Sequence, residues 1–174
     1  MLLHPYAHDP ARRAQSTITH VRPGDVQPNA VDVRLGRVWY LTGNFELMES
    51  SKQTRNRVEV PLISTARGAM WRLSPGIYEV EMINGVVVAE GEAGRVIPRS
   101  TLVRNGISIV SGLYDSGYAG PIGGLMFVGA MVNEFHHVTF EQNVRVAQYI
   151  TFKAETAHMY EGNYGWAVDQ KSVS

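Results

Sequence analysis

One pattern recurs from residue 31 to residue 155: a short run rich in Val, Ile, Tyr and Phe, ended by Gly, Pro, Asn or Ser. Examples are "VDVRLGRVWYL", "GIYEVEMI", "ISIVSGLY" and "VRVAQYITFKAE". β-branched and aromatic side chains favour strands, whereas the residues between the runs favour turns. The chain is therefore predicted to form a mainly β fold built from many short strands.

Composition limits the partners that such a fold could have. The 174 residues suit one domain, and 16 Lys plus Arg balance 16 Asp plus Glu, so no overall field attracts nucleic acid or an anionic membrane. No run approaches the ~20 apolar residues of a membrane span, and no basic segment followed by an apolar run opens the chain. With no cysteine, disulfides are excluded. We expect a cytoplasmic protein that binds neither nucleic acid nor membrane.

Three segments are predicted along the chain. Residues 1–26 are polar and proline-containing and read as an N-terminal arm, residues 27–158 as the β domain, and residues 159–174 as a flexible, glycine-containing tail. One short helix is predicted within "RSTLVRNG" at 99–106. Turns are predicted at "SPG" (74–76), "ING" (83–85) and "DSG" (115–117), because Gly accepts positive φ and Asp or Asn bonds its own backbone.

The segment "PRSTLVRNG" gathers groups that suit a phosphate. Arg99, Ser100, Thr101 and Arg104 supply two guanidinium groups and two hydroxyls within six residues. The plain alternative is an N-capped surface turn with solvated arginines, and spacing alone favours that alternative.

The segment "GLYDSGYAG" offers a carboxylate between two tyrosines. Asp115 could orient or deprotonate a water, and a nearby tyrosine could offer a flat face to a sugar or base. A hairpin tip with tyrosines packed across the strands explains the same residues, and spacing alone again favours it. Further along, "RVAQYITF" is either a plain strand or one that brings Gln148 to the same pocket. The adjacent His136 and His137 would point to opposite faces of a strand, so we predict no histidine metal site.

The order of these motifs along the chain and the distances between them favour the functional interpretation over the plain one. Taken in sequence, "VDVRLG", "PGIYEVE", "PRSTLVRNG", "GLYDSGYAG", "RVAQYITF" and the Gly- and Tyr-containing tail resemble the family of trimeric dUTPases and dCTP deaminases, over about residues 27–166. "RSTLVRNG", "LSPGIYEVE" and "MYEGNYG" are closer to the deaminase branch, whereas "GLYDSGYAG" is very similar to the third motif of dUTPases. The resemblance implies a distorted β-barrel or jelly-roll-like subunit, assembled as a homotrimer whose sites are shared between subunits.

The resemblance also implies roles for individual residues. Asp115 matches the catalytic aspartate that activates the water attacking the α-phosphorus, Tyr118 matches the aromatic residue on the deoxyribose, and Asp32 matches an acid that supports the arginine motif. The hairpin from 107 to 118, with Ile109, Val110, Ser111 and Gly112, would read the pyrimidine through its backbone. The phosphate contacts would be Arg99, Ser100, Thr101, Arg104 and Gln148. Mg²⁺ would arrive on the triphosphate oxygens and need few protein ligands, so no dedicated metal cage is expected.

Departures from the family pattern indicate which reaction to expect. Deaminases of this family use a glutamate ten residues after the aspartate, and that position is Leu125, with no acid before Glu134. A leucine cannot shuttle protons, so deamination is disfavoured, whereas hydrolysis keeps its aspartate, arginine and serine. "EQNVRVAQ" lacks the usual glycine before its arginine, and the tail lacks the Gly-rich, Arg- and Ser/Thr-containing end of dUTPases.

We therefore expect Mg²⁺-dependent hydrolysis of a deoxypyrimidine triphosphate, with dUTP cleaved to dUMP and pyrophosphate as the leading reaction. Two alternatives stay open: a dCTP deaminase, and a non-catalytic nucleotide-binding regulatory trimer of the same fold.

Overall fold

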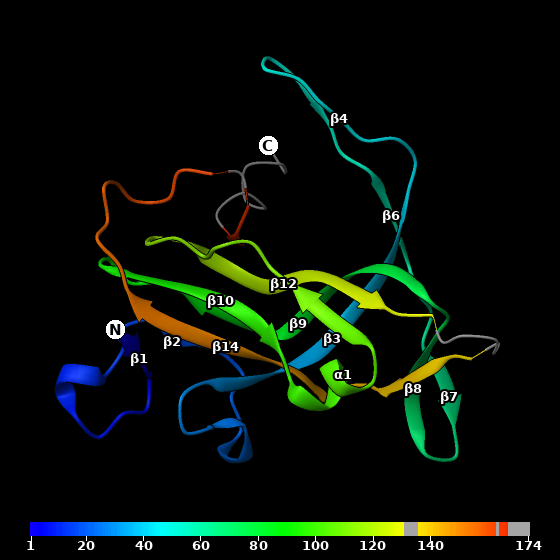
Figure 1. The fold of residues 1–174 in the computed structure, drawn as a ribbon, viewed down its shortest axis with the longest axis horizontal. Helices are drawn as coiled ribbons and strands as arrows, with labels where there is room; N and C mark the ends of the chain where they lie inside the picture. The colour runs from blue at the N-terminus through cyan, green and yellow to red at the C-terminus, as the bar shows by residue number, and fades with distance from the viewer. Residues whose placement is uncertain (131–135, 163, 167–174) are drawn as a thin grey trace.

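The computed structural model describes residues 1–130, 136–162 and 164–166 (Figure 1). Parts of two predicted features, the end of the tail (163 and 167–174) and Glu134, lie outside the described residues. The mainly β prediction is confirmed, because strands dominate the described chain and the α-helix α1 (Ser100–Arg104) has five residues. Two 3₁₀ turns, η1 (Pro10–Arg12) and η2 (Pro23–Asp25), interrupt the N-terminal segment.

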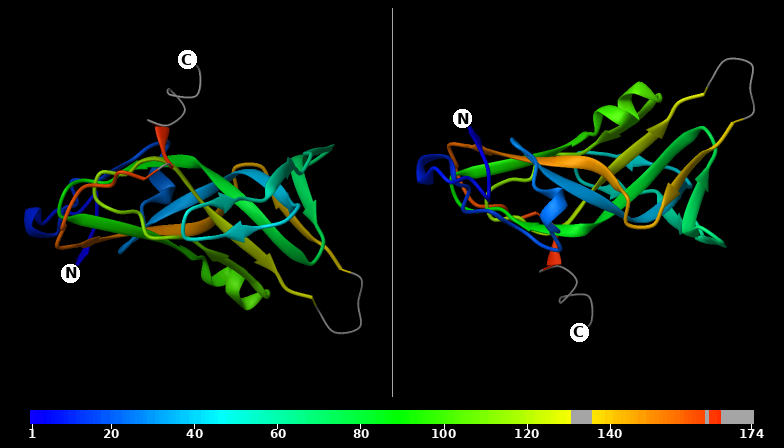
Figure 2. Two further views of the ribbon diagram at one scale, coloured as in Figure 1. Left: turned by 90° about the horizontal axis from the view of Figure 1, so that it is seen from above. Right: turned by 90° about the horizontal axis from the view of Figure 1, so that it is seen from below.

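One large sheet forms the body of the molecule, and its long strands run along the long axis (Figures 1 and 2). Its order is β1 (Leu2–Leu3), β14 (Arg145–Lys153), β3 (Val31–Thr42), β9 (Gly76–Val87), β12 (Ala119–Val128) and β11 (Ile107–Val110). Three more strands pair at its sides: β10 (Glu92–Pro98) on β14, β2 (Thr17–Ile18) on β9 and β6 (Asn56–Glu59) on β3. All the neighbours pair antiparallel.

Strand β3 joins the two halves of this sheet. Its first residues pair with β14, and its later residues pair with β9 and β6. The register shifts around Gly36, where an added Cβ would lie 2.9 Å from the Ile83 nitrogen. A glycine is needed at this close crossing of backbones. The short strands β1 and β2 fill the sides of β14 and β9 that β3 leaves uncovered.

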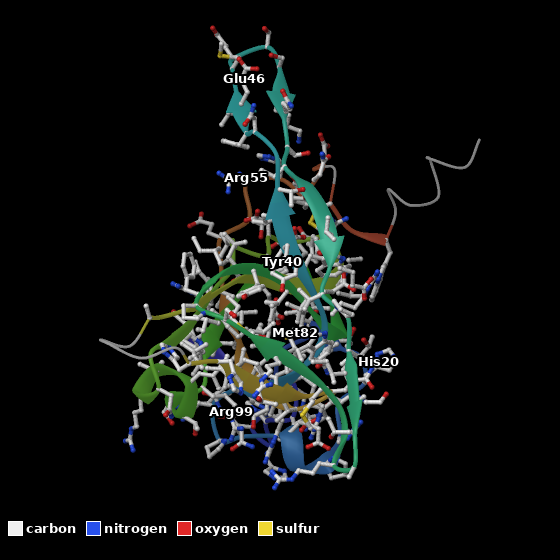
Figure 3. The ribbon with its side chains drawn as sticks, turned by 90° about the vertical axis from the view of Figure 1, so that its right-hand side faces the viewer. His20, Tyr40, Glu46, Arg55, Met82 and Arg99 are labelled. Atoms are coloured by element: carbon white, nitrogen blue, oxygen red, sulfur yellow. The ribbon has the colours of Figure 1, made fainter. Side chains whose placement is uncertain are left out.

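Two smaller elements extend from the body. The strands β13 (Val138–Glu141), β8 (Gly68–Leu73) and β7 (Ile63–Thr65) make a three-stranded sheet. The pair β4 (Glu46–Leu47) and β5 (Lys52–Gln53) forms a hairpin that projects away from the body at Glu46, while Arg99 lies at the other end of the same view (Figure 3).

The core lies between the inward faces of the long strands. Alternation along β9 and β12 places every second side chain inward, as expected for half-buried strands. The largest fully buried side chains include Trp71, Tyr149, Leu35, Leu73, Ile109, Ile122 and Met126.

Two of the three predicted turns are found, and one prediction was wrong. "DSG" closes the hairpin of β11 and β12, and "SPG" separates β8 from β9. "ING" makes no turn, because β9 continues through it. The buried Asn84 side chain accepts from the Arg34 N–H at 2.9 Å and donates to the Thr19 carbonyl at 2.9 Å. Gly85 leaves space for Trp166, so asparagine and glycine serve packing here and not chain reversal.

Candidate functional site

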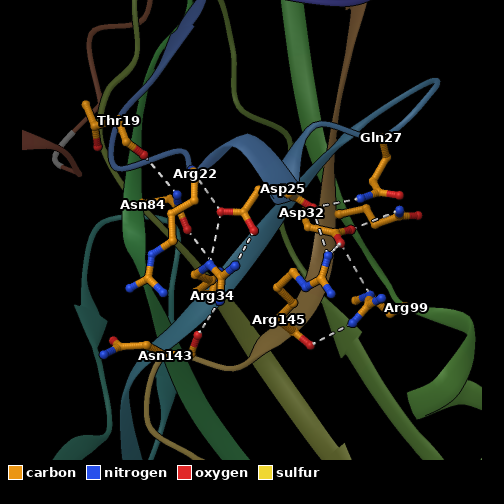
Figure 4. A network of polar contacts seen from close by, with 12 residues as sticks. Thr19, Arg22, Asp25, Gln27, Asp32, Arg34, Asn84, Arg99, Asn143 and Arg145 are labelled. Atoms are coloured by element: carbon orange, nitrogen blue, oxygen red, sulfur yellow. Dashed lines mark hydrogen bonds and ion pairs between the residues drawn. The ribbon is translucent and has the colours of Figure 1, made fainter.

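A buried carboxylate gathers basic and amide side chains from three strand ends (Figure 4). Asp32 on β3 is 0% exposed, and its Oδ2 lies 3.3 Å from Arg145 Nη1 and 3.6 Å from Arg99 Nε. Gln148 Nε2 donates to Asp32 Oδ1 at 3.1 Å. The sheet register explains the grouping, because Gln148 and Asp32 are directly paired on β14 and β3. The predicted residues Asp32, Arg99 and Gln148 are therefore brought together.

A second buried carboxylate extends this network. Asp25 of η2, also 0% exposed, pairs with Arg34, whose Nη1 donates to the Asn143 carbonyl at 2.9 Å. Burial raises the pKa of Asp25, but the hydrogen bonds from Arg34 and from the Arg22 N–H lower it more, so the net pKa is below 3.8. The two carboxylates hold three arginine side chains in place.

Helix α1 presents the remaining phosphate candidates beside Arg99. Arg99 occupies the residue before the helix, and its own N–H donates to the Val146 carbonyl at 3.2 Å. Ser100, Thr101 and Arg104 are exposed, whereas Leu102 is buried and anchors the helix. The side chain of Arg99 is 30% exposed and that of Arg145 is 36% exposed, so both guanidinium groups border solvent. This end of the sheet is a basic surface with two hydroxyls.

Asp115 stands on the hairpin between β11 and β12. It is exposed and borders a cleft of about 600 Å³ whose other wall is the segment 154–162. Its neighbour Ser116 is buried and donates to the Glu92 carbonyl at 2.6 Å, which fixes the hairpin tip on β10. The carboxylate is thus held on a rigid tip and open to a ligand.

The same hairpin encloses a second cleft of about 410 Å³. Its lining includes Gly112, Leu113 and Tyr118. Tyr118 is 8% exposed, and its hydroxyl donates to the Pro121 carbonyl at 2.8 Å. Of the other predicted hairpin residues, Ile109 faces the core, Val110 is exposed, and Ser111 donates to the Gly112 carbonyl at 2.8 Å. The structure therefore places a cavity at the backbone predicted to read a base.

The C-terminal segment covers these clefts from outside. Tyr160 donates its N–H to the Ser116 carbonyl at 2.8 Å, and its ring meets Tyr118 edge to face at 5.6 Å between centroids. Tyr164 and Gly165 also border the second cleft. The described part of the tail is packed against the hairpin.

Asp115 and the arginines lie near opposite ends of β10. Tyr114 bridges Gly94 near the start of β10, while Arg99 follows its last residue. Five residues of strand span about 17 Å at 3.3 Å per residue. The fold of a single chain therefore does not bring Asp115 to the phosphate-binding candidates.

No group of three or more His, Cys, Asp or Glu side chains with metal-ligand geometry occurs in the part of the chain that the structure describes. Within the same residues, no helix has the length and apolarity needed to cross a bilayer.

Several contributors were missed by the sequence interpretation. Asp25 and Arg34 were given no role, although Asp32 and Arg34 stand two apart on a strand and so share a face. That spacing was an available signal for Arg34. Nothing local marked Asp25, whose partner lies nine residues away across a 3₁₀ turn.

Comparison with known proteins identifies the family of this chain. Residues 6–154 match the family described as dCTP deaminase-like. A relative from Methanopyrus kandleri, named probable deoxyuridine 5'-triphosphate nucleotidohydrolase, is 34% identical over 143 residues, covering 80% of this chain and 86% of the relative. A protein of the same name from Halobacterium salinarum is 28% identical over 150 residues, covering 83% and 87%.

Solved structures support the fold. The 2'-deoxycytidine 5'-triphosphate deaminase from Agrobacterium tumefaciens matches with a TM-score of 0.56 at 16% identity, over 78% of this chain and 43% of that protein. This chain thus spans less than half of that deaminase. A mutant dUTPase from a Staphylococcus aureus phage, phi11, matches with a TM-score of 0.50 at 12% identity, over 86% and 97%. Its structure is described as revealing a structural Mg(II) ion.

Proposed function

The chain belongs to the dCTP deaminase-like family, and from this membership we propose that it is a nucleotide hydrolase that cleaves dUTP to dUMP and pyrophosphate. The observation that carries the proposal is the 34% identity to a relative named as a dUTP nucleotidohydrolase, across most of both chains. The site geometry supports it, because an open carboxylate and a cleft with room for a nucleoside share one hairpin.

Asp115 is proposed as the group that orients and deprotonates the attacking water. The water oxygen forms a bond to the α-phosphorus, the bond from that phosphorus to the bridging oxygen breaks, and pyrophosphate leaves. Asp115 accepts the proton that the water releases. An exposed carboxylate on a tip anchored by Ser116 is suited to this role. Tyr118 is proposed to pack against the deoxyribose at the edge of the second cleft.

Arg99, Gln148 and the α1 hydroxyls are proposed to hold the phosphates. Asp32 keeps Arg99 and Gln148 in position, so these donors need little reorganisation when negative charge develops in the transition state. Ser100, Thr101 and Arg104 border the same surface and are exposed to an incoming anion.

The separation of Asp115 from Arg99 supports an assembly in which one subunit supplies the aspartate and a neighbour supplies the arginine. We propose a homotrimer with three such shared sites. The division into an arm (1–26), a β domain (27–158) and a tail (159–174) stays a prediction within this proposal.

Mg²⁺ fits these residues as a hydrated ion carried by the substrate. The described residues provide no three-ligand cage, and Mg²⁺ commonly keeps several waters while binding phosphate oxygens and one or two carboxylates. When bound, it would neutralise charge on the phosphates and on the departing pyrophosphate.

Deamination of dCTP is the second candidate, because the family and the Agrobacterium structure include that chemistry. Against it, β12 carries no acid, and Leu125 occupies the position expected for the proton shuttle. Release of ammonia from dCTP would establish deamination in place of hydrolysis.

The first test is to incubate the protein and Mg²⁺ with dUTP and follow dUMP and pyrophosphate. Asp115→Asn is expected to bind nucleotide but to turn over at least ~100-fold more slowly, the scale of a positioned general base. Glu155→Gln is the matched control, since Glu155 is an exposed carboxylate on the opposite wall of the same cleft. Near-wild-type turnover by Asp115→Asn would remove Asp115 from the reaction.

Shared sites are tested by mixing two inactive variants. Co-expressed Asp115→Asn and Arg99→Ala chains would form mixed trimers in which a site is intact when one subunit brings Asp115 and its neighbour brings Arg99. At equal amounts each condition holds for half of the subunits, so about a quarter of the wild-type activity is expected. No recovery in the purified mixed trimer would argue that each site lies within one subunit.

A further inference from the structure

The segment 154–162 is fastened to the hairpin tip beside Asp115 at two points, and both are on Ser116. The Thr156 hydroxyl lies 2.6 Å from the Ser116 hydroxyl, and the Tyr160 N–H donates to the Ser116 carbonyl at 2.8 Å. Ser116 is 4% exposed and follows Asp115 directly in the chain. The position of the Asp115 carboxylate therefore depends on a residue that this segment holds.

The hydrogen bonds of the two hydroxyls have a defined direction. Ser116 donates its one hydroxyl hydrogen to the Glu92 carbonyl at 2.6 Å, so Thr156 is the donor in the contact between the two hydroxyls. Thr156 in turn accepts the Gly91 N–H at 3.1 Å. Three hydrogen bonds thus run from Gly91 through Thr156 and Ser116 to Glu92, and each hydroxyl both donates and accepts.

Both ends of this chain of hydrogen bonds lie at the start of β10, which other contacts hold in place. Gly91 has a φ of +75°, and its carbonyl accepts the Ala154 N–H at 2.8 Å. Glu92 is 5% exposed, and its carboxylate accepts the N–H groups of Gln15 and Ser16 at 2.7 and 2.9 Å. The start of β10 is therefore a firm support to which Thr156 ties the tip.

Thr156 acts on the tip and not on the carboxylate itself. Among the described residues its hydroxyl bonds only to Gly91 and Ser116, and not to Asp115. Without this hydroxyl, the Gly91 N–H loses its acceptor and the Ser116 oxygen loses its donor. A general base must lie within about 2.6–3.2 Å of the water that it deprotonates. A tip that shifts by a fraction of an ångström would therefore slow the reaction.

We propose that Thr156 is a positioning residue for the attack on the α-phosphorus, because its hydroxyl holds the tip where Asp115 meets the water. This inference rests on the proposed function, since it takes Asp115 as the group that activates the water. The plain alternative is that Thr156 only secures the C-terminal segment to the body. Its loss would then lower stability and leave kcat unchanged.

The test compares Thr156→Val, which keeps the shape but removes the hydroxyl, with Thr156→Ser, which keeps the hydroxyl. Thr156→Val is expected to lower kcat for dUTP at least ~10-fold, the effect of a displaced catalytic group. Its Kd for the non-hydrolysable α,β-imido analogue of dUTP, with Mg²⁺, should stay within ~3-fold of wild type, and Thr156→Ser should recover kcat to within ~3-fold. Thr151→Val is the matched control, because that hydroxyl is buried without a partner among the described residues.

Hydrogen exchange reports on the tip without any turnover. The N–H groups of Gly117 and Tyr118 donate to the Val88 and Asp115 carbonyls at 2.9 and 3.0 Å, so their exchange rates follow the rigidity of the tip. Both amides are expected to exchange faster in Thr156→Val and at the wild-type rate in Thr156→Ser. Unchanged exchange in Thr156→Val would overturn the proposal.

The kinetic outcomes decide between positioning and plain structural support. Wild-type kcat in folded Thr156→Val, or a loss of kcat matched by an equal loss of analogue affinity, would overturn the role of Thr156. If Thr156→Val does not fold, Ser116→Ala removes the same hydrogen bond from the other side, and wild-type kcat in that variant would overturn it. If the wild-type protein does not hydrolyse dUTP, the proposed function fails, and the exchange rates still show whether Thr156 holds the tip.

Discussion

Replacing Asp32 by asparagine tests how much the buried carboxylate contributes to the arginine surface. The substitution keeps the shape of the side chain but removes a negative charge located 3.3 Å from Arg145 Nη1 and 3.6 Å from Arg99 Nε. Two guanidinium groups then face each other with no carboxylate between them. The fold should become less stable, and Arg99 should lose its preferred position.

The size of the loss follows from burial on each side of the contact. Removing one partner of a fully buried pair costs about 3–5 kcal/mol. The Arg99 and Arg145 side chains are 30% and 36% exposed, so water screens part of the interaction. We therefore expect about 1–3 kcal/mol of unfolding free energy. For a chain of this size, 2 kcal/mol corresponds to a fall in Tm of about 4–8 °C.

The measurement is the Tm of the Asp32→Asn variant, and the Tm of the Glu59→Gln variant serves as the control. Glu59 accepts two hydrogen bonds from Arg37, at 2.8 and 3.3 Å, but both side chains are about half exposed, so the loss should stay below about 0.5 kcal/mol. Hydrolysis assays with dUTP should show a fall in both kcat and kcat/KM, because the displaced donors no longer meet the charge of the transition state. Equal changes in Tm for the two variants, or an unaltered kcat, would refute the reasoning.

Four further results are expected. Burial raises the pKa of Asp25, but its contacts with Arg34 outweigh burial and hold this pKa below 3.8. The ionised Asp25 therefore stabilises the fold fully above about pH 4, and this stabilisation is lost as the pH falls through the folded pKa. Asp25→Asn should flatten the decline of Tm in acid, and a decline identical to that of the wild type would contradict this. Tyr149→Phe should leave the unfolding free energy within about 0.5 kcal/mol of wild type, since its hydroxyl has no partner among the described residues, and a denaturant titration checks it. Gly94→Ala should lower that free energy by at least about 2 kcal/mol in the same titration, because the new Cβ would overlap the Tyr149 hydroxyl. EDTA should abolish dUTP hydrolysis without changing the Tm, and a large fall in Tm would indicate a structural metal instead.

Local sequence information was sufficient for the long strands and the helix, but not for the short strands β1, β2, β4 and β5. Alternation of apolar residues predicted β3, β8 and β14, and the pair of arginines after Pro98 marked α1. The turn prediction failed at "ING", because Asn84 and Gly85 make contacts with residues distant in the sequence instead of reversing the chain. A residue that serves a distant partner carries no local mark of that purpose.

The candidate site was predictable only as separate parts. The aspartate and arginine motifs were found, but their placement at opposite ends of β10 depends on sheet register, which the sequence does not display. Tyr114 was read as packing across the hairpin, and its bond to Gly123 became visible only with the shift in β12.

The pairing of the first strand with the last governs how this chain can fold. Leu2 lies opposite Phe152 and Leu3 opposite Thr151, so this pairing joins residues about 150 positions apart in the sequence. Contacts between such distant residues slow folding, typically to milliseconds to seconds, because a long loop must close first.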